Sequence, residues 1–180
     1  MKFAVYLRAI NVGGRKLLMA DFKAAMAKAG FKDVQTIGAA GTAVIEAKAS
    51  SETLEGEIEA LLAADCGMAI EVFVRDHAQM AAIVKGNPFT RKVKDKPAFV
   101  AVSFLKGPAG KGEVEAVREK IVGFGGPEEI GAGPECLYFS YPDGQGQSKL
   151  TPVVIERAVK LRGTARNWNT VVKMTELTAE

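Results

Sequence analysis

The chain has 180 residues, of which 48% are hydrophobic and 25% charged, and its formal net charge is +3. This composition excludes an intrinsically disordered protein, because disorder requires low hydrophobicity together with high net charge. The weak positive charge permits an anionic partner without requiring one, since solvated lysines also account for it. Cys66 and Cys136 lie far apart with no CxxC spacing, which indicates free thiols in a reducing compartment.

The N-terminal residues do not have the pattern of a secretory signal peptide. Arg8 and Asn11 interrupt the first apolar run before it reaches the length of a signal-peptide core. No window approaches the roughly 18 apolar residues that a membrane-spanning helix needs. We therefore expect a cytoplasmic protein that does not contact a membrane.

A strand and a helix are predicted first. Residues 3–7 are apolar on both faces, as in an interior strand. Apolar residues recur at helical spacing over 18–29, and Gly30 stands where a glycine commonly ends a helix. Two short strands, 34–37 and 42–47, follow on either side of a glycine turn.

A second helix and a fourth strand complete the first half. Ser50 or Ser51 can cap this helix, which is expected to stop by Gly67. Residues 70–74 then alternate as a half-buried strand. The resulting order, βαββαβ, is that of a ferredoxin-like unit, which we place at residues 1–76.

The middle segment, residues 77–97, is predicted to contain a short helix followed by a basic linker. Asn87 and Pro88 interrupt regular structure. The basic residues at 91–96 (RKVKDK) could touch nucleic-acid phosphates, and a solvated connector explains them as well.

Residues 98–180 repeat the same order more loosely. We expect strands at 98–105, 128–131 and 136–141, with a helix between the first two that ends near Gly123. Polar loop residues follow at 143–147.

The last elements begin at Thr151, a hydroxyl cap followed by proline at the first helical position. Gly163 is expected to end this helix, residues 164–166 to form a short strand, and Asn169 to cap a final helix. The sequence therefore predicts an α+β protein with two ferredoxin-like halves and a C-terminal helix. The halves share their element order, and the sequence shows no residue-level repeat.

Four motifs occur in order along the chain: 7–14 (LRAINVGG), 87–89 (NPF), 148–151 (SKLT) and 164–171 (TARNWNTV). Together they resemble the bacterial family called domain of unknown function 1697, over nearly the whole chain. The resemblance implies a duplicated ferredoxin-like fold and brings no established activity. The family usually has glycine where Ala9 stands, and Ser-Gly-Asn-Val-Val-Phe where residues 40–45 read AGTAVI.

The first motif suggests an anion site. Consecutive amides at Gly13 and Gly14 can form a nest, and Arg15 and Lys16 would add positive charge. The segment lacks the spacing of a Walker A loop and of a GxGxxG fingerprint. The other interpretation is a tight turn in which the glycines supply positive φ angles.

The last motif also combines charge with amides. Arg166 could hold a phosphate, Trp168 could stack on a ring, and the asparagines could contact polar edges. Alternatively, Trp168 fills the core, Asn169 caps a helix and Arg166 pairs with a carboxylate. Lys149 is a further candidate cation.

Other chemistries are poorly supported. His77 is the single histidine, and there is no GxSxG elbow for a serine nucleophile. Neither cysteine has a neighbouring basic motif that would activate it. Two cysteines and one histidine are too few for a structural zinc site. We therefore expect no catalytic residue, metal or cofactor.

The leading hypothesis is a protein that binds an anionic ligand such as a nucleotide or a nucleic acid. It requires the start and the end of the chain to converge on one cavity. The alternatives are a protein-interaction or oligomerisation module and, less favoured, an enzyme acting on a phosphorylated metabolite by positioning and electrostatics. The candidate ligand-binding residues are Arg8, Asn11, Gly13, Gly14, Arg15, Lys149, Arg166, Asn167, Trp168 and Asn169.

Overall fold

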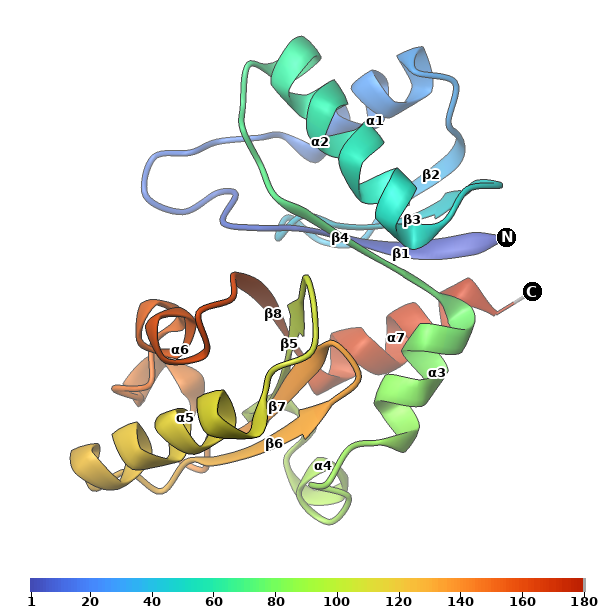
Figure 1. The fold of residues 1–180 in the computed structure, drawn as a ribbon. Coiled ribbons are helices and arrows are strands. Elements are labelled where there is room, and N and C mark those ends of the chain that lie inside the picture. The colour runs from blue at the N-terminus through green and yellow to red at the C-terminus, as the bar shows by residue number, and fades with distance from the viewer. Residues whose placement is uncertain (180) are drawn as a thin grey trace. The chain divides into compact units, whose positions relative to one another are not determined.

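The computed structural model describes residues 1–179 and contains two four-stranded antiparallel sheets with their helices (Figure 1). The predicted α+β fold with two ferredoxin-like halves and a C-terminal helix is confirmed. The chain divides into two compact units. One comprises Met1–Ala81 and the C-terminal residues from Met174, and the other comprises Ala82–Lys173.

The first unit has the order βαββαβ. Its sheet runs β2-β3-β1-β4, so β1 is interior and β2 and β4 are the edges. Its elements are β1 (Lys2–Leu7), α1 (Met19–Lys28), β2 (Lys32–Thr36), β3 (Thr42–Glu46), α2 (Ser51–Cys66) and β4 (Val72–Asp76).

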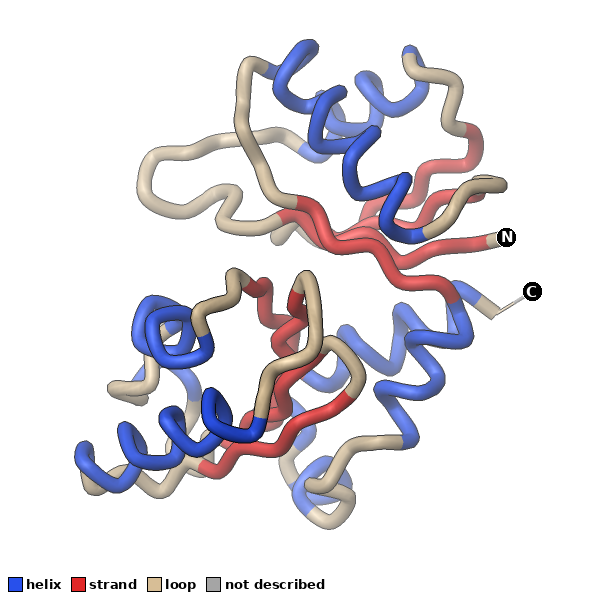
Figure 2. Tube along the Cα trace, in the orientation of Figure 1, coloured by secondary structure: helices blue, strands red, loops and turns tan. Residues whose placement is uncertain are grey.

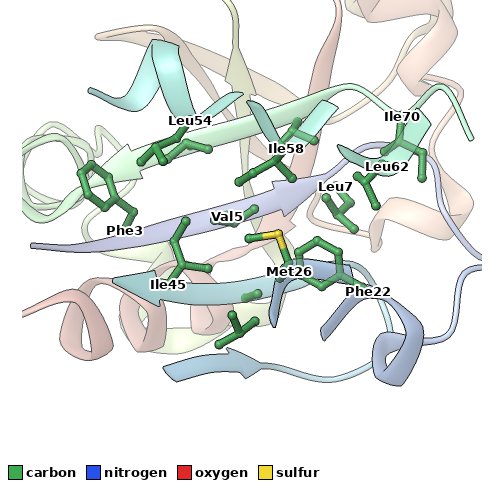
Figure 3. Close-up of a cluster of buried hydrophobic side chains, with 14 of the residues drawn as sticks. Phe3, Val5, Leu7, Phe22, Met26, Ile45, Leu54, Ile58, Leu62 and Ile70 are labelled. Atoms are coloured by element: carbon green, nitrogen blue, oxygen red, sulfur yellow. The ribbon is translucent and has the colours of Figure 1, made fainter. Parts of the chain in front are cut away.

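The core of the first unit lies between its sheet and the helices α1 and α2 (Figure 3). Alternate residues of β1 point into it, because successive side chains of a strand face opposite sides of the sheet. The labelled contributors are Phe3, Val5, Leu7, Phe22, Met26, Ile45, Leu54, Ile58 and Leu62 from the strands and helices, and Ile70 from the loop before β4.

The second unit repeats this arrangement with the sheet order β6-β7-β5-β8. Its core lies on the face covered by α5 and α6. The remaining elements are α3 (His77–Lys85), α4 (Lys92–Asp95), a 3₁₀ turn (Pro97–Phe99), β5 (Val100–Leu105), α5 (Lys111–Phe124), β6 (Glu129–Gly133), β7 (Cys136–Ser140), a 3₁₀ turn (Gln145–Gln147), α6 (Pro152–Val159), β8 (Gly163–Asn167) and α7 (Trp168–Thr178).

Two predicted helix starts are confirmed. The Ser50 hydroxyl accepts a hydrogen bond from the Thr53 amide at 3.2 Å, and the Thr151 hydroxyl accepts one from the Val154 amide at 3.4 Å. Each satisfies one of the amides that a helix leaves without an internal partner. Among the described residues, no helix has the length and apolarity needed to cross a bilayer.

The predicted end of α5 near Gly123 is confirmed, and two other predicted helix boundaries in the second half are wrong. Helix α5 ends at Phe124, with a left-handed cap at Gly125, whereas α6 ends already at Val159, with Lys160 as its cap at a φ of +58°. Gly163 instead begins β8. Asn167, not Asn169, caps α7, since its Oδ1 accepts the Thr170 amide at 3.0 Å.

Helix α2 protects the edge strand β4. The outward amides of Val72 and Val74 donate to the carboxylates of Glu59 and Glu55, each at 2.9 Å. These glutamates are four residues apart and so lie on one face of α2. The next outward amide, that of Asp76, donates to Gln79 at 2.9 Å. The edge therefore offers no free row of donors to another strand.

The two units share a residue-level repeat that the sequence did not reveal. Arg75 and Arg166 are each the fourth residue of a five-residue edge strand, and each donates from Nη1 to the preceding backbone carbonyl, at 2.7 and 2.8 Å. The next residues, Asp76 and Asn167, each accept the amide three positions ahead at the start of a helix. The equivalence of Arg75 and Arg166 follows from the strand registers, in which Arg75 lies opposite Ala4 of β1 and Arg166 lies opposite Val102 of β5.

Ala9 adopts a φ of +51°, in the left-handed region that favours glycine. The Cβ atom makes this conformation costly for alanine, by roughly 1–2 kcal/mol. A glycine would adopt the same conformation without this cost.

We expect Ala9→Gly to raise the free energy of unfolding by about 0.5–1 kcal/mol, because relief of the strained φ exceeds the added flexibility of the unfolded chain. Urea denaturation measures the change. The matched control is Ala24→Gly, at an exposed position of α1, which should lower stability by roughly 1 kcal/mol. A destabilising Ala9→Gly would contradict this account.

Candidate functional site

The segment between β1 and α1 is a long loop that closes as a small hairpin (Figure 2). Val12 and Arg15 form an isolated antiparallel bridge around Gly13 and Gly14, whose φ angles are +57° and +83°. Two successive positive φ angles are typical of a primed hairpin turn, whereas a nest alternates right- and left-handed residues. The glycines therefore build a turn, and α1 begins only at Met19.

Asn11 holds this loop together. Its Nδ2 donates to the carbonyls of Leu17 at 3.2 Å and Ala39 at 2.7 Å, and its Oδ1 accepts the Leu17 amide at 3.1 Å. The side-chain amide thus replaces a backbone ladder between two parts of the loop. Because both ends of the amide are engaged, Asn11 positions the hairpin and does not present its side chain to a ligand.

The cations of the loop differ in their engagement. Arg8 is partly buried and lies 3.6 Å from the Glu71 carboxylate. Arg15 is exposed, and its Nη2 donates to the Ala69 carbonyl at 2.5 Å. Lys16 is exposed next to it. Within residues 1–179, no hydrogen-bond acceptor meets the amides of Gly13 and Gly14.

The C-terminal candidates belong to the second unit. Arg166 is half-buried, and its Nη1 donates to the Thr164 hydroxyl and the Ala165 carbonyl, both at 2.8 Å. Asn167 caps α7 through its Oδ1. Both side chains therefore have roles in the strand-to-helix junction, in parallel with Arg75 and Asp76 of the first unit.

The three remaining candidates differ in how much of the side chain is exposed to solvent. The Trp168 side chain is only 8% exposed, so its ring offers little surface for stacking on a base. Asn169 and Lys149 are exposed. The structure thus brings Arg166, Asn167, Trp168 and Asn169 together by chain continuity, while the loop candidates belong to the other unit, and convergence of the two groups stays a prediction.

A hollow of about 140 Å³ in the second unit contains Lys149 among its lining residues. On its wall the Ser148 hydroxyl donates to the Glu128 carboxylate and accepts the Leu150 amide at 3.0 Å. Burial, followed by the negative charge of Glu128, raises the pKa of Tyr141 well above its usual value. A carboxylate beside Lys149 weakens the hollow as an anion site.

A second hollow of about 340 Å³ was missed by sequence reasoning. It is lined by Arg157, Lys160 and Arg162, together with Val153, Glu156 and Leu161. The signal that could have found it is the basic pattern of residues 157–162 (RAVKLR) at the end of a helix. Cations there also complement the negative end of the α6 dipole, which supplies a structural reason for them.

The nucleophilic and metal chemistries gain no support from the geometry. His77 is exposed, and its Nδ1 lies 3.2 Å from the Thr175 carbonyl at the end of α7. Burial, then the charges of Asp65 and Asp21, raises the pKa of Cys66, which disfavours its thiolate. No group of three or more metal-ligating His, Cys, Asp or Glu side chains occurs in the described part of the chain.

The duplicated ferredoxin-like fold, with a glycine hairpin after its first strand, places the chain in a class of small α+β proteins. Residues 1–138 match the family described as protein of unknown function (DUF1697), and the chain belongs to this family. The motif at 164–171 lies beyond the matched residues. No curated protein matches the chain.

Among solved structures, the chain is similar to the conserved bacterial protein SP0830 from Streptococcus pneumoniae. The TM-score is 0.70 at 17% identity, and the match covers 99% of this chain and 98% of the other. At this identity the likeness shows the fold and carries no statement about function.

We expect Arg166→Ala to lower the free energy of unfolding by about 1–3 kcal/mol, because it leaves Thr164 and the Ala165 carbonyl without their cationic donor. Thermal and urea denaturation measure this loss. The control is Lys149→Ala, at an exposed position, which should change stability by less than about 0.5 kcal/mol. If Arg166→Ala instead keeps full stability, the arginine is available for a ligand.

Trp168→Ala should destabilise the protein by about 3–5 kcal/mol, because it removes a large, almost fully buried ring at the first position of α7. Denaturant unfolding monitored by circular dichroism measures the change, since the variant lacks the fluorescent residue. A loss below about 1 kcal/mol would show that the ring contributes little packing.

Proposed function

We propose that the protein binds an anionic ligand, a nucleotide or a single-stranded nucleic acid, through the hairpin at residues 11–16. The observation that supports this proposal is the concentration of positive groups at one exposed turn. Arg15 and Lys16 are both exposed, and the neighbouring glycine amides have no acceptor among the described residues. Backbone amides and cations together are the groups that phosphate oxygens accept hydrogen bonds from.

The local charge balance favours an anion. The segment from Arg8 to Lys16 contains no acidic residue, and the Glu71 carboxylate lies 3.6 Å from the Arg8 guanidinium. Exposed charges attract phosphates through solvent with a strength that falls as salt is added. The proposal therefore predicts weak, salt-dependent binding without a deep pocket.

The geometry favours phosphate contacts over recognition of a base. Trp168 is buried and Asn11 is committed to the loop, so neither offers a ring or an amide for reading a base. Binding through phosphates alone carries no sequence preference. We therefore propose a ligand recognised by its charge.

Fluorescence anisotropy with a labelled single-stranded oligonucleotide tests the proposal, with ATP as a competitor. Binding should weaken linearly on a double logarithmic plot against salt. Replacing Arg15 and Lys16 together by glutamine should reduce the slope by about 0.7 for each phosphate that the protein no longer neutralises. Asn11→Ala reports separately on the loop itself, because it removes the clamp and leaves both cations in place.

The matched control replaces Lys23 and Lys48 by glutamine, since both are exposed lysines of the same unit and the net charge changes equally. If the two double variants lose the same amount of affinity for the oligonucleotide, binding depends on net charge alone. The hairpin would then not be the site. If the wild-type protein does not bind the oligonucleotide even at low salt, the proposed function is wrong.

A further inference from the structure

Three of the four sheet edges in the two units carry a feature that blocks the addition of another strand. At β4, the outward amides are taken by Glu55, Glu59 and Gln79. At β2, the register shifts between Lys32 and Gln35, and a residue inside the shift has a positive φ. Bulges and charged groups of this kind are the usual protection of exposed edges.

The edge strand β8 is protected in a different way. The guanidinium of Arg166 donates to the Ala165 carbonyl, as that of Arg75 does to the Val74 carbonyl in β4. A cation folded onto an edge carbonyl occupies an acceptor that an added strand would need, and it places a charge at the edge.

The outer edge of β6 has none of these features. The strand, Glu129–Gly133, reads EIGAG and pairs with β7 in an unbroken register without lysine, proline or bulge. Gly133 and Cys136 flank a two-residue turn, and the pair that flanks such a turn exchanges hydrogen bonds, so Ile130 and Ala132 direct their backbone groups outward. Beyond its pairing with β7, no described residue hydrogen-bonds to this backbone.

Packing explains why two of the five residues of β6 are glycine. A Cβ on Gly131 would lie 2.6 Å from the Pro88 ring, and a Cβ on Gly133 would lie 2.6 Å from the Tyr138 ring. Pro88 therefore requires glycine at position 131, and the Tyr138 ring requires it at position 133. Ala132 between them is exposed, so the backbone is accessible to another strand.

We propose that β6 pairs antiparallel with β6 of a second copy of this chain, about a twofold axis at Gly131. In this register Ile130 lies opposite Ala132 of the second copy, so the outward groups of both copies satisfy each other. Glu129 lies opposite Gly133 of the second copy, so no like charges meet, and Lys92 already pairs with Glu129 within the chain. The β6-containing sheets of the two copies then form one continuous sheet.

The self-complementary register favours a second copy over a foreign peptide. If β2 paired with β2 of a second copy, the charged residues Lys32 and Asp33 would enter the pairing. At β4 the outward amides of Val72 and Val74 already donate to Glu59 and Glu55. At β6 the strand contains a single charge, which is internally paired. Two identical edges therefore meet without a change of conformation.

Sedimentation velocity across a wide concentration range tests the proposal. The average mass should rise from the 19.1 kDa of one chain toward twice that value. Ala132→Pro should hold the protein as a monomer with unchanged circular dichroism, because the lost amide points away from β7. Ala132→Val, which retains the amide, should still dimerise.

Ala132→Lys is a second blocking variant in case proline disturbs the hairpin, since an edge lysine opposes pairing without removing a hydrogen bond. A wild-type protein that stays monomeric at every concentration overturns the proposal. So does a dimer that both folded blocking variants leave intact. A monomer that binds an added extended peptide at β6 assigns the edge to a different partner and also overturns it.

Discussion

The carboxylate of Glu55 is the interaction on which the first unit most depends. It is 9% exposed, and one of its oxygens accepts both the Val74 amide at 2.9 Å and the Arg75 guanidinium at 3.1 Å. It therefore joins a helix, an edge strand and a buried cation. Removing one member of such a pair leaves an uncompensated charge in the interior, which typically costs about 3–5 kcal/mol. Together with Glu59, it also closes the sheet edge.

The arginine that Glu55 binds, and the residue that follows this arginine, have counterparts in the second unit. Arg166 and Asn167 occupy the strand positions of Arg75 and Asp76, and they make the corresponding bonds to a carbonyl and to the start of a helix. The arginine ties down the end of an edge strand, and the next residue starts the following helix. A motif that looks like a ligand site in the sequence thereby has a structural function in both halves.

Several of the arginines are held by contacts within their own unit. Arg8, Arg75 and Arg166 are engaged within their units. Exposed cations lie at the hairpin tip and along the end of α6, and those of the hairpin carry the proposed anion binding. An open edge at β6 gives the second unit a different kind of accessible surface, made of backbone rather than side chains. The two surfaces correspond to two of the three classes of function that the sequence left open, a binder of anions and an oligomerisation module.

The sequence by itself determined the element order, the caps at Ser50 and Thr151, and the identity of the apolar positions that form each core. These depend on local periodicity and on bonds between residues a few positions apart, so they can be read along the chain. The end of α6 could not be read in this way, because its left-handed cap is Lys160 and the next glycine, Gly163, begins β8. Tertiary structure alone decided that Asn11 is a clamp, that Arg166 matches Arg75 and that β6 is open. Each of these rests on strand register or on contacts between distant residues, which no local pattern encodes.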